Sequence, residues 1–248
     1  MSRNAKIVTA VVVVLIVAVG AGLFWFLGGD TPDEVSLDAA AESVTTTTQD
    51  VDDAPATTPP PAAGLDGAWV VDTESGEFDY ESATGTFAGF RVAEELAGIG
   101  ATEAVGRTGD VDGTMTIDGT TVTSADFEID LSTITTDDSR RDNRVRDALE
   151  VEQFPTATFS LTEPIDLGAE ADEGGPVSVT APGELTVKGV TNSVEFPLEA
   201  QLIDDTIVVV GSLVIEFGDY GVEVPSAPIV VSAEERGPIE LQLLLVRS

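Results

Sequence analysis

The stretch "SADFEIDLS", residues 124–132, decides the fold class. Its apolar residues Ala125, Phe127, Ile129 and Leu131 alternate with three carboxylates. Because successive side chains of a strand point to opposite faces, this strand buries one face and exposes the other to water. One-sided alternation of this kind is typical of an antiparallel sheet that closes on itself.

The same alternation recurs along residues 68–248, which we expect to form one domain. The further apolar residues at period two are Met115, Ile117, Ile207, Val209, Leu213, Ile215, Phe217, Ile239, Leu241, Leu243 and Leu245. Turn clusters such as "KGVTN" and "IDDT" separate the strands at hairpin spacing, without the long helices that a parallel sheet needs. The sequence therefore predicts a mainly β domain, an antiparallel sandwich or barrel. Two segments, "IVVVGSLVIEF" and "IELQLLLV", are apolar on both faces, so a helix or a further strand must cover their outer face.

Composition restricts the chemistry. The chain of 248 residues has 45 acidic and 11 basic side chains and a net charge of −34, which argues against a nucleic acid or an anionic membrane surface as a partner of the soluble part. It has no cysteine and no histidine, which excludes disulfides, thiolate nucleophiles, Ser-His-Asp catalysis and the usual zinc sites.

No pair of carboxylates stands out by its spacing, although a hydrolase with paired carboxylates remains an alternative. Lys188 lies in a hairpin turn, where an exposed lysine is ordinary. We expect a protein that is not an enzyme, with no catalytic residue, metal ligand or cofactor.

The N-terminus predicts a membrane anchor. Residues 7–27 form an uninterrupted uncharged and mostly apolar segment, long enough as a helix to cross a bilayer. Residues 1–6 contain Arg3 and Lys6, whereas acidic residues follow the segment, so the positive-inside rule places residues 1–6 in the cytoplasm. A cleaved signal peptide is the alternative, but the length of the segment favours an uncleaved anchor. We expect a single-pass protein of the cell membrane with its domain on the extracytoplasmic side.

Residues 28–67 predict a linker. Threonine, proline and acidic residues dominate this segment, and it has few large apolar side chains with which to offset the entropy of ordering. We expect it to be disordered and extended, a stalk that holds the domain away from the membrane.

One segment is rich in arginine and predicts a helix. It reads "SRRDNRVRDALEVEQFPTATFSL", residues 139–161. Ser139 followed by Asp142 fits the start of a capping box, and apolar residues follow at i, i+3 and i+4 from Val145. The helix, of about ten residues, must end before Pro155, after which alternation resumes.

Three motifs in order, "LSTITTDDSRRDNRVRD", "FPTATFSL" and "GELTVKGVTNSVEFPLEA", resemble the YceI-like family of exported lipocalin-like proteins. The resemblance implies an extended, eight-stranded antiparallel β-barrel with a short helix near one end. It also implies an isoprenoid lipid, either a polyprenyl chain or an isoprenoid quinone, as the ligand in the barrel. Arg144 and Glu74 depart from the family, because many members have histidine at these positions.

The resemblance also implies a polar fixture at the end of the barrel, formed by Arg141 and Asp142. These residues either contact a ligand head group or brace the helix against the barrel, and the brace is favoured because an unpaired buried charge is costly. A small barrel either fills with its own side chains or holds one ligand, and the resemblance favours a cavity. The residues expected to line it are Phe127, Ile129, Leu131, Phe159, Leu185, Phe196, Leu213, Ile215 and Phe217.

The sequence thus predicts a non-catalytic binding or carrier protein for an isoprenoid lipid, anchored in the membrane and facing outward. The alternative is a structural or interaction protein of the cell envelope, with a barrel filled by side chains.

Overall fold

The computed structural model describes residues 31–49, 64–81, 83–225 and 227–248. The strands are β1 (Gly67–Val71), β2 (Phe87–Leu96), β3 (Gly100–Thr108), β4 (Val111–Asp118), β5 (Thr121–Asp130), β6 (Thr156–Leu161), β7 (Ile165–Asp166), β8 (Val177–Val187), β9 (Val190–Ile203), β10 (Thr206–Glu216), β11 (Val230–Ala233) and β12 (Arg236–Arg247). The helices are α2 (Leu37–Gln49), α3 (Ser139–Leu149), α4 (Ala169–Asp172) and the 3-10 turn η1 (Phe217–Tyr220). Strands therefore dominate, as the alternation predicts.

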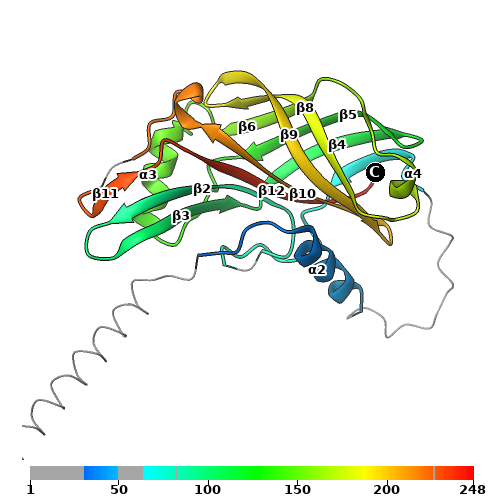
Figure 1. Ribbon diagram of the computed structural model, residues 1–248, viewed down its shortest axis with the longest axis horizontal. Helices are drawn as coiled ribbons and strands as arrows, with labels where there is room; N and C mark the ends of the chain where they lie inside the picture. Colours follow the sequence, from blue (N-terminus) through cyan, green and yellow to red (C-terminus); the bar gives the residue numbers. More distant parts are fainter. Residues whose placement is uncertain (1–30, 50–63, 82, 226) are drawn as a thin grey trace, which may run out of the picture.

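Eight of the strands close into an antiparallel barrel (Figure 1). Their order is β1-β4-β5-β6-β8-β9-β10-β12, and β12 returns to β1 through the pairing of Leu245 with Val71. Every adjacent pair is antiparallel, so the predicted eight-stranded antiparallel barrel is confirmed. Trp69, Ile117 and Leu245 lie in its interior and are almost fully buried.

A second set of strands extends the sheet beyond the barrel. The C-terminal part of β12 pairs with β1, but its N-terminal part pairs with β2, in the register of Ile239 with Phe90. β2 forms a hairpin with β3 and also pairs with β11 on its other edge near Leu96. We call β2, β3 and β11 the wing. It projects at the end of the barrel where α3 lies (Figure 1).

An N-terminal arm, residues 31–49, packs against the outside of the barrel, with α2 below β10 in Figure 1. Leu37 and Ala40 of α2 contact the outer-face side chains of Val208, Val210 and Leu244. These three belong to the two segments that are apolar on both faces, so α2 is the cover that they require. The expectation of disorder across residues 28–67 is therefore wrong for residues 37–49, because a short apolar stripe at helical spacing meets a complementary outer wall.

The remaining N-terminal predictions concern other parts of the chain. The proposed membrane segment, residues 7–27, lies outside the described residues, as do residues 28–30 and 50–63 of the linker. Across the part of the chain that the structure describes, every helix is too short or too polar to span a bilayer.

Candidate functional site

The barrel encloses an apolar cavity of about 260 Å³. Leu65 and Ala171 line it at the end near α4, and Val145 and Val222 line it at the end near α3, so it extends along the barrel. Nearly all of its lining side chains are aliphatic or aromatic. A cavity of this length and composition suits a long apolar molecule and offers little to a polar one.

Eight of the nine residues predicted to line a cavity do so. They are Phe127, Ile129, Leu131, Phe159, Leu185, Phe196, Ile215 and Phe217. Leu213 does not line it, although alternation places it on the same face of β10 as Ile215. Leu213 is half-buried where β10 pairs with β12, opposite Ile239.

Strand register brings the predicted aromatic residues together. Phe127, Phe159 and Leu185 are directly paired across β5, β6 and β8, so their side chains line up on the inner face. The rings of Phe159 and Phe196 meet edge to face, with centroids 6.1 Å apart and an interplanar angle of 86°. This arrangement is the favourable one for two aromatic quadrupoles.

Two glycines make room for these rings. Gly113 is paired with Phe127, and a Cβ at this glycine would lie 2.2 Å from the ring. A Cβ at Gly183 would lie 2.4 Å from the ring of Phe159. This role could not be predicted from the sequence, since a glycine within an alternating strand indicates a close approach but does not identify the residue that approaches.

Helix α3 covers one end of the cavity. Val145, Ala148 and Leu149 line the cavity there, and no residue of α3 is fully buried. The cap differs from the prediction, because Asp138 rather than Ser139 is the N-cap and accepts a hydrogen bond from the Arg140 N–H at 2.7 Å. This backbone hydrogen bond lowers the pKa of the Asp138 carboxyl. The apolar face of α3, predicted as a helix face, thus becomes part of the cavity wall.

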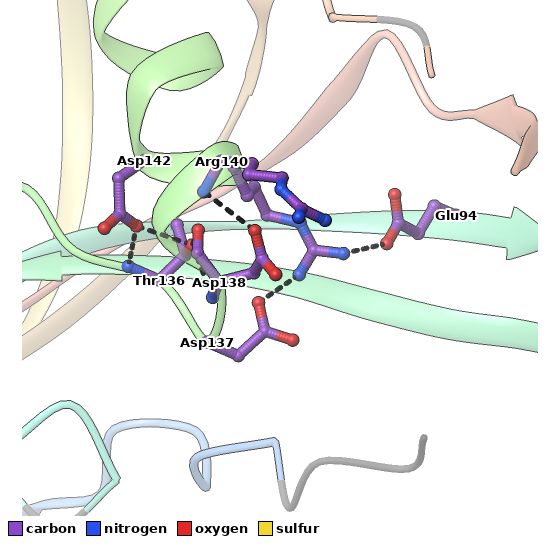
Figure 2. A network of polar contacts seen from close by, with 7 residues as sticks. Glu94, Thr136, Asp137, Asp138, Arg140 and Asp142 are labelled. Carbon is purple, nitrogen blue, oxygen red and sulfur yellow. Dashed lines mark hydrogen bonds and ion pairs between the residues drawn. The ribbon is translucent and has the colours of Figure 1, made fainter. Parts of the chain in front are cut away.

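The predicted polar fixture ties this helix to the barrel. Arg141 donates to Glu94 of β2 at 3.0 Å and also pairs with Asp137. Asp142 accepts hydrogen bonds from Thr136, from its N–H at 2.6 Å and from its hydroxyl at 2.7 Å (Figure 2). Neither Arg141 nor Asp142 lines the cavity. Their contacts are those of a brace between α3, the preceding turn and the wing.

Lys188 provides a second tie at the same end. Its ammonium lies 2.8 Å from the Gly221 carbonyl and 2.8 Å from the Glu150 carboxylate, at the C-cap of α3. The residue occupies the β8–β9 turn with a positive φ of 51°. It therefore connects a hairpin to the helix and does not face the cavity.

Few polar residues reach the cavity, and they carry little reactive chemistry. They are Thr108, Gln201, Tyr220 and Glu240. Burial raises the pKa of the Tyr220 phenol, so this residue remains neutral. The Glu240 side chain is paired with Arg91. Among the described residues, no group of three or more acidic side chains is arranged to hold a metal ion. The arrangement is suited to binding rather than to bond making.

Comparison with known proteins agrees with this architecture. A family model for the YceI-like domain matches residues 69–244. A polyisoprenoid binding domain from Saccharophagus degradans, implicated in plant cell wall breakdown, has the same fold, with a TM-score of 0.55 and 20% identity over 73% of this chain and 98% of that chain. Burkholderia cenocepacia BcnA is also similar, with a TM-score of 0.48 and 21% identity over 63% of this chain and 95% of that one. No curated protein matches the sequence.

Proposed function

Because the chain belongs to the YceI-like family, we propose that it binds an isoprenoid lipid, a polyprenyl chain or an isoprenoid quinone, inside its barrel and catalyses no reaction on it. The observation that carries this proposal is the apolar cavity that extends from α4 to α3. The similar domain from Saccharophagus degradans is described as polyisoprenoid binding, which supports the same ligand class.

Apolar burial supplies the affinity. Each square ångström of apolar surface removed from water contributes roughly 25 cal/mol, so a long hydrocarbon chain is held without polar recognition. The inward rings of Phe127, Phe159 and Phe196 form a wall against which such a chain packs. The head group of the ligand lies at one end of the barrel, and the α3 end suits it because the half-exposed face of α3 borders the cavity there.

The proposal includes a location. Residues 7–27 anchor the chain in the cell membrane, and the barrel faces the extracytoplasmic side. There the protein shields the apolar tail of a lipid and stores it or moves it close to the bilayer. The long apolar segment and the basic residues before it support this location.

The alternative is a structural protein of the cell envelope whose barrel is filled by its own side chains. The cavity favours the carrier, because a filled barrel leaves no continuous space along its axis.

Ligand extraction tests the proposal. The full chain is purified, extracted with organic solvent and examined by mass spectrometry, and added polyprenyl compounds are then titrated against it. We expect a bound isoprenoid, and we expect Ala200→Trp, which places an indole in the cavity, to lower the bound amount strongly. Ser178→Trp is the matched control, because Ser178 is exposed on the neighbouring strand β8. Recovery of no lipid together with no binding of added polyprenyl compounds would refute the carrier.

A further inference from the structure

The tip of the wing is uncharged. It consists of residues 96–102, around the β2–β3 turn, and residues 227–233, which include β11. The two segments lie side by side, since Val230 pairs with Leu96 and the Ala97 N–H donates to the Ile229 carbonyl at 2.8 Å. Neither segment contains an acidic or basic residue, although 23% of the chain's residues are charged.

The tip also exposes large apolar side chains. Ile99 is 38% exposed, Ile229 is 48% exposed and Val231 is 62% exposed. These are three of the six large exposed hydrophobic residues that the described chain carries. Single exposed aliphatic residues are ordinary, but three on adjacent segments form a patch that favours association with an apolar phase.

Three carboxylates flank the tip on the side toward the barrel. Ser232 pairs with Glu95, and Glu234 and Glu235 follow the end of β11, all three acidic residues being exposed. These carboxylates must remain in water, which limits the tip to shallow insertion. They also repel anionic head groups, so the surface is suited to a neutral interface.

Hydrogen bonds hold the first residues of the N-terminal arm against the wing. Arg91 of β2 donates to the Pro32 carbonyl at 2.7 Å, and Arg107 of β3 donates to the Asp33 carbonyl at 2.6 Å. Both strands belong to the wing. The first residues of the arm therefore contact the wing, the same part of the protein that carries the tip. Five residues from Leu27 to Pro32 span at most about 18 Å. The part of β2 from Arg91 to its end at Leu96, next to the turn that carries Ile99, is about 17 Å long. A membrane segment at residues 7–27 therefore holds the tip within reach of the bilayer, unlike the long stalk that the sequence predicts.

We propose that the uncharged tip of the wing, with Ile99, Ile229 and Val231, rests on the neutral surface of a lipid bilayer. The contact places the α3 end of the cavity next to the membrane. The strand β2 and the segment before β11 lead into the tip, and both also contribute to the cavity wall, through Phe90 and Val92 and through Val222 and Val224. The tip is thus the surface at which lipid enters and leaves. Only this purpose rests on the proposed function; the contact itself does not require a bound isoprenoid.

Depth-dependent quenching tests the contact. Since the chain has no cysteine, Ala97→Cys at the tip and Ala169→Cys at the α4 end give a matched pair of exposed labelling sites. Each full-length variant is labelled with a polarity-sensitive dye and reconstituted in phosphatidylcholine vesicles containing nitroxide-labelled phosphatidylcholine, without isoprenoid. We expect the dye at Ala97→Cys to be quenched several times more strongly than the dye at Ala169→Cys. Equal quenching at the two sites would overturn the proposal.

Surface substitutions separate the tip from the anchor. Ile99→Ser, Ile229→Ser and Val231→Ser, combined in the Ala97→Cys chain, alter only exposed side chains and should abolish the excess quenching. Retention of the full quenching in this variant would overturn the proposal. Replacing part of the phosphatidylcholine with phosphatidylglycerol should reduce the quenching at low salt, and added salt should restore it.

A second copy of the chain is the other possible occupant. Excimer emission from a pyrene label at Ala97→Cys, without quenching by nitroxide lipid, would assign the tip to self-association and would overturn membrane contact.

The vesicle measurement tests the membrane contact, and the mass spectrometry of extracted ligand tests the proposed function, so the two results are independent. Quenching without a bound isoprenoid would support the contact and refute the proposed ligand.

Discussion

Arg91 on β2 and Glu240 on β12 form an ion pair of 2.8 Å in which both side chains are only 2% exposed. Arg91 also donates to Glu103 at 2.7 Å and to the carbonyls of Pro32 and Asp33. Burial opposes the charged guanidinium, but the hydrogen bonds to Glu103 and Glu240 outweigh burial and raise the pKa of Arg91. One side chain therefore joins the barrel, the wing and the N-terminal arm.

Replacement of Arg91 should destabilise the protein strongly. In Arg91→Met, the one cationic partner that Glu240 retains among the described residues is the more distant Arg107, 3.8 Å away. Breaking a buried pair on one side costs about 3–5 kcal/mol of unfolding free energy, whereas replacing both partners with apolar residues is often close to neutral. We expect urea denaturation to show this loss for Arg91→Met and a substantial recovery for Arg91→Met combined with Glu240→Met.

A surface pair provides the control for this experiment. Arg236 and Glu216 lie 4.0 Å apart, and both side chains are more than half exposed. Arg236→Met should change the unfolding free energy by less than about 1 kcal/mol. An Arg91→Met variant as stable as Arg236→Met would contradict the role of Arg91 as a buried junction.

Release of the N-terminal arm should be possible without unfolding the barrel. Ala40 is 2% exposed and packs against the barrel wall, so Ala40→Asp places a carboxylate in an apolar contact. We expect limited proteolysis to cleave within residues 31–49 of this variant much faster than in the parent, while residues 68–248 remain intact. Ala39→Asp is the matched control, because Ala39 is the exposed neighbour on the same helix. Equal cleavage of the two variants would show that α2 does not depend on this packing.

The sequence predicted the inner wall because local alternation determines which face of a strand is apolar. Phe127 and Phe159 could be assigned to the cavity for this reason. Leu213 shows the limit, since it lies on the same face of β10 between Val209 and Ile215, which both line the cavity, and alternation alone does not say whether a given side chain reaches the cavity. The wing could not be predicted, because β12 divides one edge between β1 and β2, and pattern alone does not specify such a non-local pairing.

The brace formed by Arg141 and Asp142 was predicted, but the ordered arm and the partner of Asp142 were missed. The stripe that contains Leu37 and Ala40 is too short to predict an ordered helix, and its partner Val208 lies far along the chain. Asp142 was assigned to the helix cap, but its carboxylate accepts hydrogen bonds from Thr136 in the preceding turn. The position of this turn depends on the end of the barrel. In both cases tertiary contacts outweigh a local preference.

Removal of the Asp142 carboxylate should loosen α3 while the barrel remains folded. Asp142→Ala leaves the half-buried N–H of Thr136 without its acceptor, which costs about 1–3 kcal/mol locally. Hydrogen exchange should accelerate at residues 134–149 and stay unchanged in β8 and β9. Asp142→Asn retains one oxygen acceptor and should recover part of the protection. Asp147→Ala, at an exposed position of the same helix, should have little effect, and exchange as fast as in Asp142→Ala would contradict the brace.

Tyr80 should remain protonated in the folded protein well beyond the ordinary range of tyrosine. Burial, followed by the charge of Asp137, raises the pKa of Tyr80 from about 10 to about 12. Between these values the folded state retains a proton that the unfolded state has lost, so stability is fully present below pH about 10 and falls as pH rises toward about 12. Titration of tyrosinate absorbance should therefore show late ionisation in the native protein and a midpoint near 10 in urea. Burial also raises the pKa of Tyr220, the other tyrosine, so Tyr80→Phe should remove part of the alkaline loss of stability and leave the contribution of Tyr220. Asp137→Asn should lower the Tyr80 midpoint. Native ionisation of Tyr80 at the same pH as in urea would show that Tyr80 is neither buried nor affected by the charge of Asp137.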